Sequence, residues 1–287
     1  MRWSRGDRSN VNDLRGAGMR RGVPLGIGGL LVVLLLSWLT GTDILSLLSG
    51  GGGSTLPPAA SVGTSGEVAT SPEEEELVDF VDAVMEDVQD TWSQVLGERY
   101  QPTRVVLFRD EIDSACGMAG SASGPFYCPA DRQVYLDLTF FDELNKRFGA
   151  PGDFAQAYVL AHELGHHLQT LLGIEAKVRN AQRSSPSEAN ALSVRMELQA
   201  DCFAGIWAKA ASVPGRAEKD LVELEPGDAE EGLRAASAIG DDRIQQMTRG
   251  RVVPDAFTHG SSKQRMEWFS RGLQSGRLEA CDTYAER

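Results

Sequence analysis

The chain has 287 residues, of which 41% are hydrophobic, and this length supports one substantial core or two small ones once non-core ends are set aside. Its formal net charge of -13 argues against a nucleic-acid-binding protein, because phosphate binding requires a basic surface. The acidity is typical of a well-solvated, soluble surface.

The N-terminal part has the pattern of a membrane anchor. Residues 1–21 are basic, and residues 22–39 carry no charged side chain over a length that suits a bilayer core. The positive-inside tendency predicts a cytoplasmic tail at 1–21, a single-pass transmembrane anchor at 22–39 and an extracytoplasmic remainder, so the cell membrane is the expected location. A cleaved signal peptide is the alternative, with Ala59-Ala60 as a candidate cleavage site.

A linker and then a folded domain are expected after this anchor. Residues 40–71 are rich in Gly, Ser and Pro, which indicates a flexible tether. Ser71, Pro72 and Glu74 have the spacing of a capping box with proline at the first helical position. The domain, residues 72–287, is therefore predicted to open with an amphipathic helix, whose apolar side chains recur up to Val95.

The remaining domain is predicted to combine a few early strands with many later helices. Strands are expected at 104–109 and 133–138, separated by a Gly- and Ser-rich loop at 117–129. Helical periodicity then covers 140–148, 154–172, 187–211, 228–247 and 261–273. This order predicts an α+β domain that is mostly helical, with a small sheet.

Four cysteines without a C-x-x-C pair argue against a zinc ribbon and allow three pairings. We favour Cys116–Cys128 and Cys202–Cys281, since an even count after an apolar N-terminal segment indicates an oxidising compartment. Four free, buried thiols are the alternative.

The motif His162-Glu163-Leu164-Gly165-His166 is the strongest chemical signal. Its spacing places both imidazoles on one helix face, where they can bind one zinc ion, while the Glu163 carboxylate can act as general base toward water. The flanking residues are apolar. A buried helix would carry these ionisable groups at a high cost without a metal, which disfavours the alternative of a solvated surface patch.

A catalytic zinc ion usually has three protein ligands. The metzincin pattern is excluded, because Gln169 and Leu172 stand where it needs glycine and histidine. His167 lies about 100° around the helix from His166. We predict Glu197 as the third ligand and Asp201, one turn later, as an acceptor for the free N–H of a liganding histidine. The alternative is that both acids are solvated helix residues.

His259 is the remaining histidine and precedes a predicted helix N-terminus. We hypothesise that it donates a hydrogen bond to the oxyanion formed during attack on a carbonyl. A packing or capping role is the alternative.

Several motifs in the same order make the chain resemble the bacterial neutral zinc metallopeptidases, which are membrane-anchored. They are Gly124-Pro125-Phe126-Tyr127-Cys128-Pro129, Val134-Tyr135-Leu136-Asp137, the segment 162–167, the segment 197–205, the segment 238–242 and Phe257-Thr258-His259-Gly260. The resemblance implies His162, His166 and Glu197 as zinc ligands and Glu163 as base. The chain also resembles thermolysin-type gluzincins, which implies a zincin-like core with a substrate-pairing edge strand. Residues 133–138 are the candidate for that strand, and an internal strand is the alternative reading.

The expected activity is zinc-dependent hydrolysis of peptide bonds in an extracytoplasmic protein or peptide. One rival is a catalytically silent, zinc-stabilised binding or scaffold protein. Another is a hydrolase that uses the same site on an amide or other non-protein substrate.

Overall fold

The computed structural model describes residues 1–16 and 70–285. The predicted anchor at 22–39 and nearly all of the predicted linker lie outside the described residues. Among the helices that the structure describes, none is long and apolar enough to cross a membrane. The folded unit combines residues from both described ranges, Met1–Arg15 and those from Thr70 onward.

The fold is α+β, as predicted, with a small mixed sheet and a majority of helices. Four strands form the sheet in the order β1-β2-β6-β5, namely β1 (Val11–Asp13), β2 (Val105–Phe108), β6 (Gln133–Asp137) and β5 (Phe126–Cys128). β1, β2 and β6 are parallel, and β5 is antiparallel to β6. A separate hairpin pairs β3 (Glu111–Ser114) with β4 (Gly117–Gly120).

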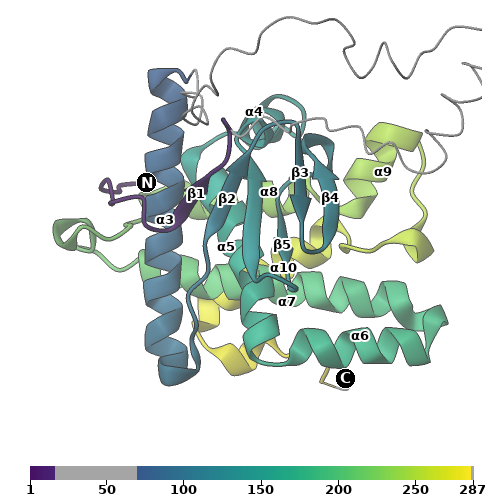
Figure 1. Ribbon diagram of the computed structural model, residues 1–287. Coiled ribbons are helices and arrows are strands. Elements are labelled where there is room, and N and C mark those ends of the chain that lie inside the picture. The colour runs from purple at the N-terminus through teal and green to yellow at the C-terminus, as the bar shows by residue number, and fades with distance from the viewer. Residues whose placement is uncertain (17–69, 286–287) are drawn as a thin grey trace, which may run out of the picture. The chain divides into compact units, whose positions relative to one another are not determined.

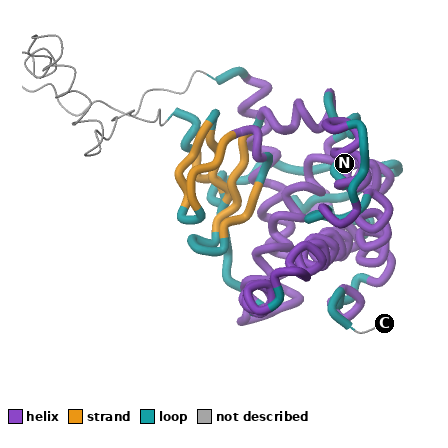
Figure 2. Tube along the Cα trace, turned by 90° about the vertical axis from the view of Figure 1, so that its right-hand side faces the viewer, coloured by secondary structure: helices purple, strands orange, loops and turns teal. Residues whose placement is uncertain are grey.

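Seven of the helices cover the rest of the domain along the chain. They are α4 (Thr139–Lys146), α5 (Asp153–Leu171), α6 (Ile174–Ser184), α7 (Ala189–Ala211), α8 (Asp228–Ala238), α9 (Asp241–Arg249) and α10 (Ser262–Ser275). Figure 2 shows the strands gathered on one side of the folded unit and most of the helices on the other. Helix α6 is not predicted, because the expected helical periodicity ends at residue 172 and resumes at 187.

The predicted first helix is present as α3 (Pro72–Leu96). The Ser71 side chain accepts a hydrogen bond from the backbone N–H of Glu74 at 3.2 Å. The Glu74 carboxylate binds the Arg109 guanidinium at 2.7 Å. Ser71 therefore caps the helix, while Glu74 connects it to the end of β2.

Three predictions about the early part of the domain need correction. The expected loop at 117–129 contains β4 and β5, which pair with the neighbouring strands β3 and β6. The candidate edge strand at 133–138 is internal, since β6 lies between β2 and β5. The third concerns the bounds of the domain, predicted as 72–287: β1 hydrogen-bonds to β2, so residues 11–13 belong to the same sheet.

The single helix expected at 228–247 is two helices, with a break at Gly240. A Cβ atom at Gly240 would lie 2.4 Å from the backbone nitrogen of Ser262, so the chain there passes too close to α10 for any other residue. The backbone N–H of Asp241 then bonds to the Gly260 carbonyl at 2.9 Å. This break turns α9 toward the loop that carries His259.

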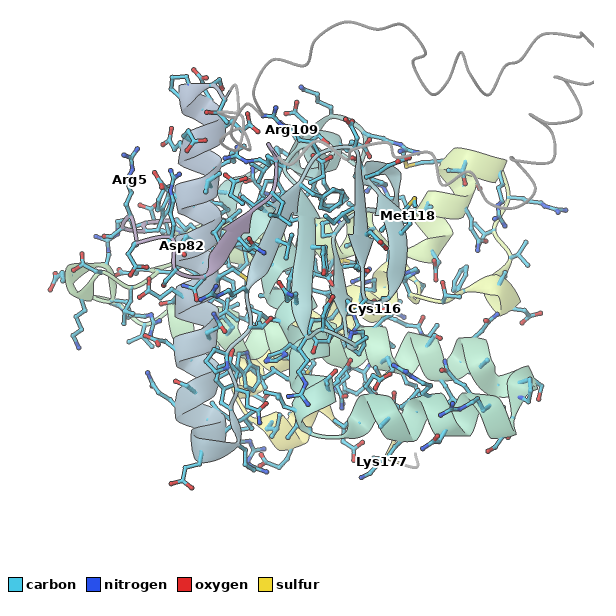
Figure 3. All side chains as sticks on the ribbon, viewed as in Figure 1. Arg5, Asp82, Arg109, Cys116, Met118 and Lys177 are labelled. Atoms are coloured by element: carbon cyan, nitrogen blue, oxygen red, sulfur yellow. A yellow bond between two sulfur atoms is a disulfide. The ribbon has the colours of Figure 1, made fainter. Side chains whose placement is uncertain are left out.

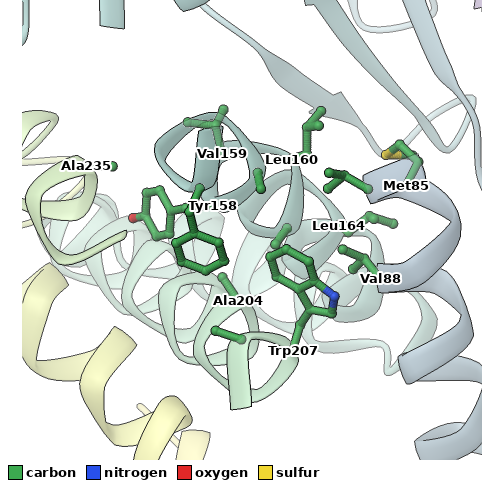
Figure 4. Close-up of a cluster of buried hydrophobic side chains, with 14 of the residues drawn as sticks. Met85, Val88, Tyr158, Val159, Leu160, Leu164, Ala204, Trp207 and Ala235 are labelled. Carbon is green, nitrogen blue, oxygen red and sulfur yellow. The ribbon is translucent and has the colours of Figure 1, made fainter. Parts of the chain in front are cut away.

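The core lies around α5, whose side chains pack against neighbours on several sides. Figure 4 shows Leu160 and Leu164 of α5 close to Met85 and Val88 of α3, with Trp207 of α7 beside them. All of these side chains are fully buried. Burial of one such side chain stabilises the fold by about 1.5–3 kcal/mol, so α5 is held firmly in place.

The structure contains both favoured disulfides, Cys116–Cys128 and Cys202–Cys281. The first ties the β3–β4 hairpin to the edge strand β5. The second ties α7 to the C-terminal 3-10 turn at Leu278–Cys281. The pairing that closes a long loop is expected to stabilise the domain more, because it restricts the unfolded chain more.

Helices α7 and α10 cross at two glycines. A Cβ atom at Gly272 would lie 1.9 Å from the Cys202 carbonyl oxygen, and one at Gly205 would lie 2.1 Å from that of Phe269. We expect Gly272→Ala to destabilise the domain by about 3 kcal/mol, because backbone atoms cannot move aside as a side chain can. Urea denaturation measures this, with Gln274→Ala on the exposed face of α10 as the control. Equal stability of the two variants would contradict the expectation.

Candidate metal centre

Helix α5 carries three of the predicted site residues in the expected arrangement. The rings of His162 and His166 lie on one face with their centroids 4.9 Å apart. His162 and Glu163 are buried, with exposed fractions of 5% and 8%. Because α5 packs against neighbouring elements on several sides, the helix face that carries His162, Glu163 and His166 lines a cleft and does not face bulk solvent.

Helix α7 brings the predicted third ligand to the two histidines. The Glu197 carboxylate lies 3.1 Å from His162 Nε2 and 3.5 Å from His166 Nε2. One donor atom from each of these three residues lies within 4.8 Å of the others. A tetrahedral ion with bonds of about 2 Å holds its ligand atoms about 3.3 Å apart, so the separations of 3.1 and 3.5 Å suit one shared ion.

A close crossing of α5 and α7 makes this meeting possible. A Cβ atom at Gly165, between the two histidines, would lie 2.9 Å from the Cα atom of Ala200. Glycine at this position therefore lets the backbones approach. Glu197, about one turn before Ala200 on α7, then reaches the histidines.

Each histidine is oriented by a hydrogen bond at its other nitrogen. His162 Nδ1 lies 2.8 Å from the Asp201 carboxylate, as predicted for that acid. His166 Nδ1 lies 2.9 Å from Gln169 Oε1, and the Gln169 amide donates to the Met196 carbonyl at 2.7 Å. Both Nε2 atoms are thus left for a shared ion, which is the tautomer a metal needs. The residue Gln169, noted in the sequence only for not being glycine, has a role in this arrangement.

A fully buried ionic network supports Asp201. The Arg265 guanidinium donates to both Asp201 oxygens at 2.9 Å, and it also donates to Tyr158 Oη at 3.2 Å. Tyr158 in turn donates to Asp201. Burial would raise the pKa of Asp201, but Arg265 and His162 outweigh it and lower this pKa to about 2. Asp201 is therefore an anion at any physiological pH, and His162 is held in one orientation.

The site as a whole stabilises positive charge. Burial alone lowers the pKa of His162, but the Asp201 and Glu197 carboxylates raise it to about 9. Burial raises the pKa of Glu197, yet the two imidazoles bring it well below its usual range. Imidazoles that favour positive charge beside a carboxylate that stays ionised form a donor set suited to a divalent cation.

Glu163 lies outside the group of three donors that meet at one point, but it lines the same cleft. Burial raises the pKa of its carboxyl, against the opposing effect of the two histidines. A raised pKa makes the carboxylate a better proton acceptor near neutral pH.

His259 lies on a loop at the rim of this cleft, with its side chain 53% exposed. Asp241 shapes that loop: one of its oxygens accepts backbone N–H bonds from Thr258, His259 and Gly260 at 2.7, 2.6 and 3.0 Å. Its other oxygen lies 3.4 Å from His259 Nδ1. This hydrogen bond raises the pKa of His259, although burial opposes it.

Asp241 lies within one of the family motifs, 238–242, but the sequence pattern predicts no role for it. The histidine at 167, by contrast, is on the other side of α5, as expected. It lies 2.6 Å from the Gln101 carbonyl and 3.1 Å from Tyr127 Oη, and burial lowers its pKa. His167 therefore connects α5 to the sheet and takes no part in the metal group.

The cleft has a volume of about 650 Å³ and runs past the candidate ligands and Glu163. The edge strand β5 and the residues Gly124 and Pro125 before it form part of its wall. Phe126 and Tyr127 of β5 line the cleft, and among the described strands β5 pairs with β6 alone. An edge strand without a second partner offers main-chain groups to which an extended peptide can add.

We expect Glu197→Gln to lower zinc affinity by more than about 100-fold, because it removes the one anionic ligand. Competition with a chromogenic chelator measures the affinity. Glu188→Gln, an exposed acid just before the same helix, is the matched control and should bind like wild type. Zinc affinity equal to wild type in Glu197→Gln would rule out Glu197 as a ligand.

Comparison with known proteins places the whole domain in one family. The family model described as "Putative neutral zinc metallopeptidase" matches residues 1–284. The "Uncharacterized protein YpfJ" of Escherichia coli (strain K12) is 45% identical over 302 aligned positions, covering 100% of this chain and 99% of that protein. The "Uncharacterized protein Rv2575" of Mycobacterium tuberculosis (strain ATCC 25618 / H37Rv) is 44% identical over 202 positions, 69% of this chain and 67% of that protein. No solved structure matches the chain.

Proposed function

The chain belongs to the neutral zinc metallopeptidase family, and on this premise we propose that it hydrolyses peptide bonds of an extracytoplasmic protein or peptide. One observation carries the proposal. His162 Nε2, His166 Nε2 and the Glu197 carboxylate converge on a single point, with Glu163 beside them in an open cleft. Two histidines and one glutamate leave a fourth position free, which is the arrangement of a catalytic zinc ion.

The residues divide the chemistry as follows. His162, His166 and Glu197 would hold the zinc ion, which would act as a Lewis acid toward a water molecule and a substrate carbonyl. Glu163 takes a proton from the water as it attacks the peptide carbonyl and passes it to the leaving amine. Asp201 and Gln169 keep His162 and His166 in the orientation that leaves Nε2 available. The edge strand β5 aligns the substrate in an extended conformation.

The two disulfides support an extracytoplasmic site of action. Cys116–Cys128 and Cys202–Cys281 include all four cysteines, and such bonds persist in oxidising compartments. A membrane attachment through residues 22–39 is part of the same proposal, and it rests on their apolar composition alone.

His259 is proposed to donate a hydrogen bond to the developing oxyanion. We expect His259→Ala to lower kcat on the order of 10²-fold with unchanged zinc content, since one oxyanion donor is lost. Asp255→Asn, in the same loop with its carboxylate in solvent, is the control. Unchanged kcat in His259→Ala would leave this histidine with a structural role only. Asp241→Asn should weaken the orientation of His259 and shift the pH dependence of kcat without loss of zinc.

The experiment that tests the proposal compares three forms of the purified chain: with zinc, stripped by a chelator, and resupplied with zinc. Degradation of a reduced, unfolded protein is followed by mass spectrometry of the products. Peptides with new termini, lost on stripping and restored by zinc, are expected. Stoichiometric zinc without any cleavage would favour the scaffold alternative. Hydrolysis of amide substrates that are not peptides would favour the alternative of a hydrolase that uses the same site on a non-protein substrate.

A further inference from the structure

The N-terminal segment is a strand of the domain rather than a tail beside it. In β1, residues Val11, Asn12 and Asp13 lie in register with Val105, Val106 and Leu107 of β2. The backbone N–H of Val105 donates to the Asn10 carbonyl, and that of Leu14 to the Leu107 carbonyl, both at 2.9 Å. Figure 1 shows this segment, in purple, between α3 and β2.

Arginines of the segment are neutralised by acids of α3. The Arg8 guanidinium lies 2.6 Å from both Glu75 and Asp79. The side chain of Arg15 is 1% exposed and lies 2.9 Å from Glu75 and 2.6 Å from Asp13. A guanidinium buried to this degree is stable only beside its counter-ions. These arginines therefore form ion pairs within the folded domain. The positive-inside prediction took no account of such pairs when it assigned residues 1–21 to the cytoplasm.

The backbone of the segment is held by the same helix. Asp82 accepts the N–H groups of Arg8 and Asn10 at 2.9 and 3.1 Å. The Gln89 amide donates to the Asn10 side chain at 2.8 Å. Trp3 packs edge-on against Phe80 with centroids 5.6 Å apart. We call the face of α3 that carries these contacts (Glu75, Asp79, Phe80, Asp82 and Gln89) the α3 docking surface. Figure 3 labels Asp82 on this surface and Arg5 of the N-terminal segment beside it.

We infer that residues 1–15 and the catalytic domain lie on the same side of the membrane, joined through the α3 docking surface. The reason is geometric: strands that share hydrogen bonds lie about 5 Å apart, whereas a bilayer core is about 30 Å thick. A segment paired with β2 cannot be cytoplasmic while β2 is outside. Because disulfides persist in oxidising compartments, the two disulfides place the catalytic domain, and with it residues 1–15, on the oxidising side of the membrane. This inference stands apart from the proposed activity.

Labelling of single introduced cysteines in spheroplasts tests the inference. Ser9→Cys reports on the segment and Val213→Cys on the domain, and both residues are exposed. The four native cysteines are all bonded, so only the new thiol reacts with a membrane-impermeant maleimide. Both thiols are expected to react to the same extent before permeabilisation. Reaction of Val213→Cys alone, with Ser9→Cys reacting only after permeabilisation, would overturn the inference.

A second measurement covers the case in which a new cysteine disturbs folding. In the purified full-length chain, Arg15→Ala is expected to lower Tm by at least about 5 °C, because Glu75 and Asp13 lose their buried partner. Arg5→Ala, whose side chain is 70% exposed, is the control and should keep the wild-type Tm. Equal Tm values for Arg15→Ala and wild type would show that the segment is not docked.

Discussion

Glu163→Gln is expected to reduce peptide hydrolysis by about 10²–10⁴-fold, the usual contribution of a general base, while the zinc content stays at the wild-type level. Glutamine has nearly the same size and keeps its hydrogen-bonding capacity, but it cannot accept the proton of the attacking water. The carboxylate lies outside the three-donor group, so its loss leaves His162, His166 and Glu197 in place.

Initial rates on an unfolded protein and zinc content by atomic absorption, from the same preparation, make the comparison direct. Glu188→Gln is the control for the loss of one acid outside the cleft. Wild-type rates in Glu163→Gln would exclude the proposed mechanism. A simultaneous loss of zinc would show that Glu163 is a ligand.

Arg265→Met is expected to destabilise the domain by about 3–5 kcal/mol, because it leaves the Asp201 carboxylate buried without its cation. Asp201 is fully buried and Arg265 is 2% exposed, so solvent cannot replace the lost partner. Zinc affinity should also fall by about 10–100-fold, since Asp201 orients His162. Urea denaturation of the metal-free protein separates the first effect from the second.

Two further variants sharpen this test. Lys263→Met, on the same helix with its side chain 82% exposed, should be as stable as wild type. Arg265→Met combined with Asp201→Asn removes both charges, and it should regain part of the lost stability. A double variant that is less stable than Arg265→Met would contradict the idea that an unpaired charge is the cause.

Local geometry explains which parts were predictable. The spacing of His162 and His166 places them one helical turn apart in any helix, so their shared face follows from the sequence alone. The spacing of Glu197 and Asp201 works in the same way on α7. The N-cap at Ser71 depends on a backbone N–H three residues away. In each case the interacting groups lie within one turn of a helix.

Contacts that composition does not reveal explain most of the corrections. The edge strand β5 lies in a Gly- and Ser-rich segment without an alternating pattern, and it forms a hairpin with β6 through the pair Tyr127 and Val134. The break at Gly240 is required by the closeness of Ser262, which belongs to another helix. Composition indicates neither feature, because β5 lacks a strand-like pattern and the contact at Gly240 comes from a different element of the fold.

The sequence pattern of the N-terminal arginines is compatible with two different locations of residues 1–15. A basic segment before an apolar stretch looks the same whether its charges face the cytoplasm or pair with acids of the domain. Arg8 and Arg15 are separated from Glu75 and Asp79 by about 60–70 residues, as the hydrogen bonds across those intervals record. Only the folded chain distinguishes the two readings.

Residue types and their spacing alone indicated the functional groups of this protein: two imidazoles and a carboxylate on one helix, a second carboxylate on another and four cysteines able to pair. The tertiary structure decided how these groups are supported. It placed Glu197 against the histidines through the Gly165 crossing, and it brought Arg265 to Asp201 and Asp241 to the His259 loop. Spacing along a helix is dictated by 3.6 residues per turn, whereas contacts between helices depend on how the whole core packs.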